Sequence, residues 1–224
     1  MVAASERTRK FVGTHLDIGS KRFEVVNDFV YLGSIISNNH DTSMEIKRRI
    51  LAAQRAYFSV SHLLKSRKIS RYAKVTMYKT LIRPVVLYGS ESWNMTSADE
   101  HAIGVFERRI LRAIFGPKKE GELFKCRSNA EVYQLFKEAD IVKRIKVNRL
   151  RWAGHVIRRP VDAPINKVFK SDFVDGKRSR GRPKNSWKEA IDRDSVALGI
   201  RNWQLETSDR TSFRRRLREV MDHN

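Results

Sequence analysis

The stretch from Ile141 to Lys184 constrains this chain most, because positive charge is concentrated in it. Its 44 residues hold fourteen lysines and arginines against three aspartates, a net charge of +11, about half of the +21 carried by all 224 residues. Such a segment repels itself unless a polyanion neutralises it, and nucleic acid is the commonest polyanion in cells. Trp152 and His155 interrupt the charge, which ends in Arg180-Gly181-Arg182-Pro183. We therefore predict a nucleic-acid-binding surface here, in preference to a solvated basic face.

The composition is that of a globular protein, with 41% hydrophobic and 32% charged residues. The single cysteine, Cys126, excludes both a disulfide framework and a cysteine-rich zinc knuckle. The six histidines are scattered, with no pair at helical metal-binding spacing. No run approaches the ~20 apolar residues that cross a bilayer, and the N-terminus lacks the apolar core of a signal peptide. We therefore expect an intracellular, nuclear protein without a metal, cofactor, small-molecule substrate or membrane partner.

The first forty residues predict β-structure. Lys10–Leu16 and Arg22–Val26 are expected strands, and Gly19-Ser20 between them suits a tight hairpin turn. Phe29–Ile36 is expected to be a third strand, because it is rich in aromatic and β-branched residues. Three strands alone bury a sheet face poorly, so we expect them to form the edge of something larger.

From Asp41 onward the apolar residues recur at helical spacing. Ser97–Glu100 and Ser128–Glu131 are capping boxes, whose side chains satisfy the free backbone N–H groups at a helix start. Pro84 is expected to kink or divide one helix. The expected helices include Ile46–Leu64, about Arg71–Tyr88, Ser97–Phe115, Ser128–Phe136, Asp140–Ile157, Ser186–Gly199 and the residues after Ser208.

These patterns predict a mainly α fold with a small N-terminal antiparallel β element. We divide the chain into a β element at residues 1–40, a helical bundle at 41–125 and a basic helical region at 126–224. The segments Pro117–Arg127 and Arg159–Asn185 show little periodicity and are expected to be basic loops.

The sequence contains no self-contained active site. It has no Gly-rich phosphate loop and no convincing Ser/His/Asp or Cys/His arrangement. Its carboxylates mostly stand at expected helix starts, where they cap the helix rather than converge on a metal ion. We therefore expect no catalysis by this chain alone.

One motif for nucleic-acid binding resembles the core of an AT-hook. In such a segment glycine permits an extended backbone, while the flanking arginines reach into the narrow minor groove of A·T-rich DNA. A solvated loop that only touches phosphates is the alternative for the same residues. The candidate residues are Lys177, Arg178, Arg180, Gly181, Arg182 and Lys184.

The second motif lies on the expected helix Asp140–Ile157. Arg151 and His155 stand at i and i+4, so one helix face can present both to a phosphate backbone. Arg149 is included as a further nucleic-acid-binding residue, and Trp152 is expected to pack inward. A third basic face, formed by Arg108, Arg109 and Arg112, is either bound or solvated.

Five segments in order resemble the end of a non-LTR (LINE-type) retrotransposon reverse transcriptase, downstream of its polymerase palm. Each segment alone is weakly specific, but the resemblance runs from about Phe11 to the C-terminus. The segments are Phe29-Val30-Tyr31-Leu32-Gly33-Ser34, Leu87-Tyr88-Gly89-Ser90-Glu91-Ser92-Trp93, Phe106-Glu107-Arg108-Arg109-Ile110-Leu111-Arg112, Arg149-Leu150-Arg151-Trp152-Ala153-Gly154-His155-Val156, and Arg180-Gly181-Arg182-Pro183-Lys184 followed by Trp187.

The resemblance implies a role for each region. Tyr31, Leu32 and Gly33 look like the primer grip, the strand turn that supports the primer end. Residues 41 to about 115 would be the thumb, which closes over the template–primer duplex. The basic C-terminal region would hold element RNA or target DNA, and a palm acting in trans is a possible partner.

The chain also departs from that family. The family's catalytic aspartates, which bind Mg²⁺, lie in palm motifs upstream of the primer grip, yet no Asp-Asp pair occurs in this sequence. The family's endonuclease domain is also absent. We therefore expect a truncated or degenerate reading frame that is inactive as a polymerase. The alternatives are a stand-alone DNA-binding protein that uses the AT-hook-like segment, and an RNA-packaging or ribosome-associated basic protein.

Overall fold

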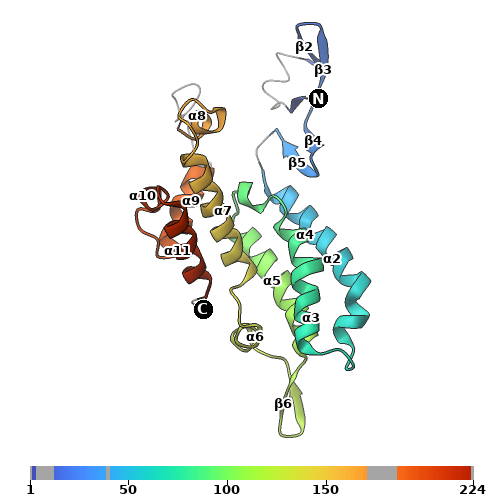
Figure 1. Ribbon diagram of the computed structural model, residues 1–224. Helices are drawn as coiled ribbons and strands as arrows, with labels where there is room; N and C mark the ends of the chain where they lie inside the picture. Colours follow the sequence, from blue (N-terminus) through green and yellow to red (C-terminus); the bar gives the residue numbers. More distant parts are fainter. Residues whose placement is uncertain (1, 4–12, 39–40, 171–185, 223–224) are drawn as a thin grey trace.

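The computed structural model describes residues 2–3, 13–38, 41–170 and 186–222 (Figure 1). Two β-hairpins from the N-terminal region lie at one end of a set of helices, and the C-terminal helices lie beside that set (Figure 1). The predicted fold class, mainly α with a small N-terminal antiparallel β element, is confirmed.

The first hairpin pairs β2 (His15–Ile18) with β3 (Lys21–Val26) across the predicted Gly19-Ser20 turn, and β1 (Val2–Ala3) adds to β3 in parallel. The expected single strand Phe29–Ile36 is instead a second hairpin, β4 (Asp28–Tyr31) paired with β5 (Ser34–Ser37). Leu32 and Gly33 both adopt positive φ, 46° and 79°, which turns the chain between them. The prediction of one strand from residue composition was wrong, because Leu32 and Gly33 form a turn whose backbone suits the twist of a tight hairpin.

The larger hydrophobic core lies among the helices that follow the hairpins. Residues such as Ile46, Ile82 and Leu111 are fully buried in it. The helices that form it are α2 (Ser43–Lys65), α3 (Arg71–Met77), the π-helical turn η1 (Tyr78–Ile82), α4 (Arg83–Leu87), α5 (Ser97–Phe115) and α6 (Asn129–Phe136).

Pro84 divides the expected helix Arg71–Tyr88, as predicted. The chain passes through η1 before α4, and Pro84 lies in the first turn of α4. A proline removes one backbone N–H donor and its ring crowds the preceding turn, so a wider π-turn relieves the clash.

The helix starts are set by side-chain caps. The Ser128–Glu131 capping box lies where the sequence predicts it. The helices predicted to begin at Asp140 and Ser186 do begin there, with Asp140 as the N-cap of one and a Ser186–Glu189 capping box at the other. The box predicted at Ser97–Glu100 is wrong by one residue. Thr96 is the cap, since its Oγ1 accepts from the Asp99 N–H at 3.2 Å and the Asp99 carboxylate accepts from the Thr96 N–H at 2.9 Å.

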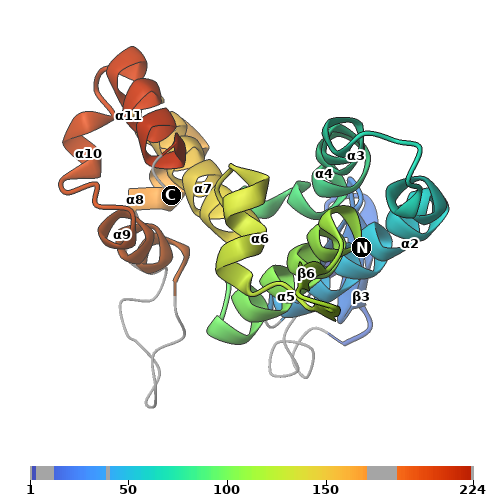
Figure 2. The same ribbon diagram turned by 90° about the horizontal axis from the view of Figure 1, so that it is seen from below.

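A second core lies on the far side of α7 (Ile141–Ile157) from α2 and α5 (Figure 2). It includes Trp203 and Phe213 and is formed by the C-terminal half of α7 with α9 (Trp187–Ala197), α10 (Trp203–Glu206) and α11 (Arg210–Asp222). Helix α7 belongs to both cores, because Ile141 and Ile145 pack into the first and the residues from Val147 onward into the second.

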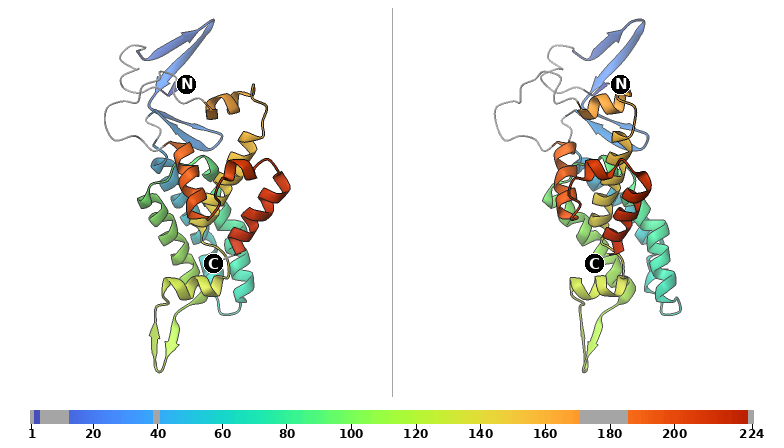
Figure 3. Two further views of the ribbon diagram at one scale, coloured as in Figure 1. Left: turned by 90° about the vertical axis from the view of Figure 1, so that its left-hand side faces the viewer. Right: turned by 60° about the vertical axis from the view of Figure 1, so that its left-hand side comes forward.

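Two segments that were expected to be loops contain regular structure. Within Pro117–Arg127, β6 (Lys118–Glu120) and β7 (Leu123–Lys125) form a hairpin that projects from the end opposite the N-terminal hairpins (Figure 3). Within Arg159–Asn185, residues Pro164–Lys170 form the short helix α8. In the described part of the chain, none of the helices has the length and apolar content to span a bilayer.

Candidate nucleic-acid interface

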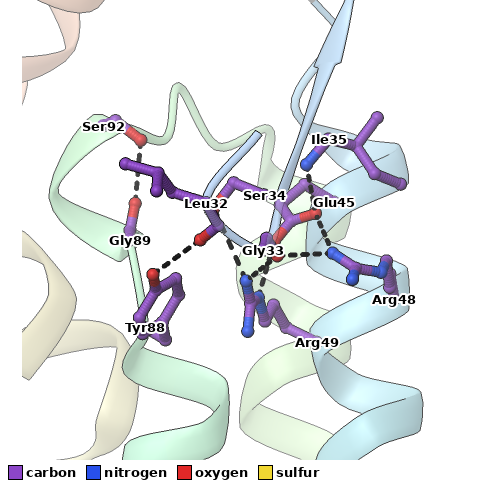
Figure 4. Close-up of polar contacts among 10 residues, drawn as sticks. All are labelled: Leu32, Gly33, Ser34, Ile35, Glu45, Arg48, Arg49, Tyr88, Gly89 and Ser92. Atoms are coloured by element: carbon purple, nitrogen blue, oxygen red, sulfur yellow. Dashed lines mark hydrogen bonds and ion pairs between the residues drawn. The ribbon is translucent and has the colours of Figure 1, made fainter. Parts of the chain in front are cut away.

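The turn that joins β4 to β5 is anchored on the helices through its own backbone carbonyls. The Leu32 carbonyl accepts from the Tyr88 hydroxyl at 2.7 Å. The Gly33 carbonyl accepts from the guanidinium groups of Arg48, at 2.6 Å, and of Arg49 (Figure 4). The Leu32 side chain itself is 74% exposed. The turn is therefore held firmly from below, while its tip faces outward.

Glu45 holds the two arginines in place. Its carboxylate is buried and accepts from Arg48 at 3.2 Å and from Arg49 Nε at 2.5 Å. It also accepts from the backbone N–H of Ile35 in β5 at 2.9 Å. One carboxylate thus fixes both the hairpin and the side chains that grip its tip (Figure 4).

The segment Leu87–Trp93 meets the turn from the other side. The Arg49 guanidinium lies over the Tyr88 ring, 4.4 Å from its centroid, which is a cation–π contact. Gly89 has φ of 70°, and a Cβ at this position would lie 3.3 Å from Ser34 Oγ. Glycine therefore serves both the left-handed backbone and the close approach of the hairpin. Two motifs that are separated by about fifty residues in the sequence form one cluster.

We expect Glu45→Ala to loosen the hairpin without unfolding the helices. Loss of the carboxylate leaves Arg48 and Arg49 without their buried acceptor and frees the Ile35 N–H, and hydrogen bonds to charged groups are worth about 1.5–3 kcal/mol each. The free energy of local opening of the β4–β5 hairpin should fall by at least the value of one such bond, about 1.5 kcal/mol. Amide hydrogen exchange at Ile35 measures this free energy. Glu24→Ala, at an exposed carboxylate of β3, is the matched control. Unchanged exchange at Ile35 in the Glu45 variant would contradict this account.

A groove with a volume of about 370 Å³ lies between α7 and α11. The Trp152 ring stacks on His155, with centroids 5.1 Å apart and an interplanar angle of 21°. Trp152 is 39% exposed, so the prediction that it packs inward was wrong. The residues that line the groove are Glu91, Asn148, Arg151, Trp152, His155, Arg158, Arg210, Phe213 and Arg214.

Gly154 explains how α11 comes so close to α7. A Cβ on Gly154 would lie 3.0 Å from a ring carbon of Phe213 and 3.1 Å from Cγ2 of Thr207. Only glycine leaves room for this contact without displacing its neighbours. The close packing brings Arg210 and Arg214 of α11 beside the Arg158 side chain.

The groove is lined by four arginines and, among the described residues, by one carboxylate, that of Glu91. Burial, and then the neighbouring Arg210 and Arg214, lower the pKa of Arg158. Burial, and then Arg159, Arg158 and Arg210, lower the pKa of His155. Arg159 Nε donates to His155 Nε2 at 3.2 Å, which requires an unprotonated acceptor nitrogen. The His155 ring is therefore stacked on Trp152 and lies among guanidinium groups, whose mutual repulsion an anion would relieve.

Arg149 is not part of this surface. Its side chain is 2% exposed, and Nη1 donates to the Asp194 carboxylate of α9 at 2.6 Å. The prediction that Arg149 contacts nucleic acid was wrong, because α9 covers that face of α7. Arg151 and His155, in contrast, both line the groove.

The other basic candidates divide into two groups. Arg112 donates to the Arg127 carbonyl and to Asn129 Oδ1, so it links α5 to the start of α6. The AT-hook-like residues lie outside the described residues: Lys177, Arg178, Arg180, Gly181, Arg182 and Lys184. In the part of the chain that the structure describes, no three His, Cys, Asp or Glu side chains are placed to hold a metal ion together.

The fold and the surface define a basic, mainly helical protein with an exposed β-turn and an arginine-lined groove. A curated protein of Caenorhabditis elegans, described as an uncharacterized transposon-derived protein, is 25% identical over 197 residues, which are 84% of this chain and 69% of the worm protein. No family model and no solved structure matches the chain. The similarity indicates a transposon origin.

Proposed function

We propose that this chain is the thumb and C-terminal nucleic-acid-binding part of a non-LTR retrotransposon reverse transcriptase, and that it binds template–primer without polymerising. The ordered motifs support the family, and the transposon-derived relative is consistent with it. Polymerisation requires paired carboxylates on metal ions, and the sequence holds no adjacent aspartates. Catalysis would therefore depend on a palm that this chain does not supply.

The observation that carries the proposal is the conformation of the β4–β5 turn. Leu32 is a branched, apolar residue with φ of 46°, and it is 74% exposed. Both properties are unfavourable for folding, because left-handed backbone suits glycine or asparagine and an apolar side chain gains nothing in water. Residues that break such local rules concentrate at functional sites. A contact between Leu32 and the primer would explain why an exposed apolar residue occupies this left-handed position.

Leu32→Asn separates function from stability. Asparagine tolerates the left-handed backbone better than leucine, so the variant should be as stable as the wild type or more so. The proposal predicts that it nevertheless binds an RNA template annealed to a recessed DNA primer several-fold more weakly. Fluorescence anisotropy with a labelled primer measures the affinity, and thermal unfolding measures the stability.

Ile36→Asn provides the matched control, because Ile36 is an exposed apolar residue of β5 away from the tip. This variant should bind the hybrid like the wild type. Equal affinity of Leu32→Asn and wild type would refute the primer-supporting role. Primer extension by the purified chain with Mg²⁺ and nucleotides would refute the claim that it does not polymerise.

The stand-alone AT-hook protein remains the competing proposal. It predicts a preference for A·T-rich duplex DNA over the RNA–DNA hybrid, lost on Arg182→Ala, with no effect of Leu32→Asn. The same anisotropy assay therefore distinguishes the two proposals.

A further inference from the structure

We infer that the groove between α7 and α11 binds single-stranded nucleic acid, with a base stacked on Trp152 and the adjoining phosphates on the arginines. This inference deepens the proposed function, because it assigns the C-terminal region a ligand distinct from the template–primer duplex at the β4–β5 turn. It rests on an aromatic platform and a charge cluster that close packing of two helices brings together.

The aromatic platform comes first. Trp152 is the largest side chain in the groove, and its stack on His155 fixes its ring orientation. A fixed, exposed aromatic ring accepts a nucleobase of any identity, since every base has a π-face. A duplex keeps its bases stacked on each other, so only an unpaired base can use such a platform.

The charge completes the site. Arg151, Arg158, Arg210 and Arg214 converge on the groove, and within the described ranges none of them lies at ion-pair distance from a carboxylate. Glu91 is the one carboxylate residue among the groove-lining residues. A single acidic group against four guanidinium groups leaves a net positive cavity. A phosphodiester backbone supplies successive anions at a spacing that several arginines can contact together.

An acidic peptide would also satisfy the charge. It would leave Trp152 without a planar partner, whereas a nucleotide uses the ring and the charges at once. The groove also adjoins the cluster at the turn, because Tyr88 bonds the Leu32 carbonyl and Glu91, three residues later, lines the groove. A strand that leaves a duplex at the turn would thus meet the groove next.

The test measures binding of the full chain to a labelled single-stranded oligonucleotide across a range of salt concentrations. Arg210→Gln/Arg214→Gln should reduce the slope of log K against log[salt] by about 1.4, since each lost phosphate contact on a single strand removes about 0.7. The matched control is Arg215→Gln/Arg218→Gln, which removes the same charge from exposed positions of α11 outside the groove. That control should leave the slope close to the wild-type value.

A second pair of variants tests the platform. Trp152→Ala should weaken single-strand binding about tenfold, a factor within the range for one base stacked on an aromatic residue. Trp152→Phe retains an aromatic face and should recover part of the affinity. Thermal unfolding verifies that both variants fold.

Three results would overturn the inference: equal slope changes for the two arginine pairs, wild-type affinity of Trp152→Ala, or displacement of the oligonucleotide by a polyglutamate peptide at equal charge concentration. Binding to the RNA–DNA hybrid with blunt ends, measured in parallel, keeps the two proposals apart. Loss of hybrid binding in Leu32→Asn with no effect of groove variants on single strands retains the primer-supporting role and rejects the groove. The opposite pattern rejects the primer-supporting role and retains the groove.

Discussion

Replacing Asp194 by alanine is expected to lower the free energy of unfolding by about 3–5 kcal/mol, because it leaves the Arg149 guanidinium buried without its counter-charge. The two groups are 2.6 Å apart, and their side chains are 2% and 6% exposed. Burial lowers the pKa of Arg149 and raises the pKa of Asp194, although each partner opposes the shift of the other. Each of the two charges is therefore stabilised in the buried site only while its partner is present. Chemical denaturation monitored by tryptophan fluorescence measures the effect.

Two controls make this prediction specific. Glu219→Ala breaks the exposed pair with Arg216, and should cost no more than about 1 kcal/mol. The double variant Arg149→Met/Asp194→Leu replaces both charges by apolar groups and should recover most of the lost stability, because no charge then remains buried. The Nε and Nη2 atoms of Arg149, which have no hydrogen-bond partner among the described residues, make that recovery easier. A loss in Asp194→Ala no larger than in Glu219→Ala would contradict the account.

The second large effect is expected at Glu107, a buried carboxylate at the junction of four helical elements. It accepts from the Tyr78 hydroxyl at 2.6 Å, the Tyr133 hydroxyl at 3.1 Å and the Ile141 backbone N–H at 2.8 Å. Glu107→Ala leaves three donors without their acceptor and opens a cavity. We expect a loss of about 2–4 kcal/mol, since each unsatisfied buried group costs about 1–3 kcal/mol and the three are coupled. Glu107→Gln, which keeps an acceptor oxygen, should lose less.

The same residue makes stability depend on pH. Burial raises the pKa of Glu107, although its hydrogen bonds lower it. A raised folded-state pKa means that its contribution is complete below the unfolded value and is lost as pH rises through the folded value. The stability advantage of the wild type over Glu107→Gln should therefore be larger at pH 4 than at pH 7. Urea denaturation of both proteins at each pH measures it, and a constant difference would contradict the raised pKa.

The sequence predicted where the helices begin better than it predicted the short strands between them. Helix starts at Ser128, Asp140 and Ser186 follow from local capping chemistry, which needs only the next three residues. The β6–β7 hairpin was missed, although Gly121, at φ of 61°, lies between alternating residues. Short strands of this kind leave little periodicity to detect, because each contributes only three residues.

The site residues were predicted less well than the helices, because their positions depend on contacts between segments far apart in the sequence. Arg149 was assigned to the surface because charge suggests exposure, and its partner Asp194 is 45 residues away in the sequence. The reverse error placed Trp152 inside, since an aromatic residue on an apolar helix suggests a core position. Neither Arg210 nor Arg214 was predicted as a site residue, although both line the groove. Their convergence on the groove depends on the missing Cβ of Gly154, whose effect only the packed structure reveals.

Because helix α7 belongs to both cores, the chain cannot be cut into two fragments that each keep a complete core. A cut before Ile141 would deprive the bundle of Ile141 and Ile145, two fully buried side chains. A cut after Ile145 would deprive the C-terminal core of a helix start that Asp140 caps. Neither half can be produced without exposing apolar surface, and exposed apolar surface promotes aggregation. The shared helix therefore makes the bundle and the C-terminal core one folding unit, so the β4–β5 turn and the α7–α11 groove have to be tested together in the full chain.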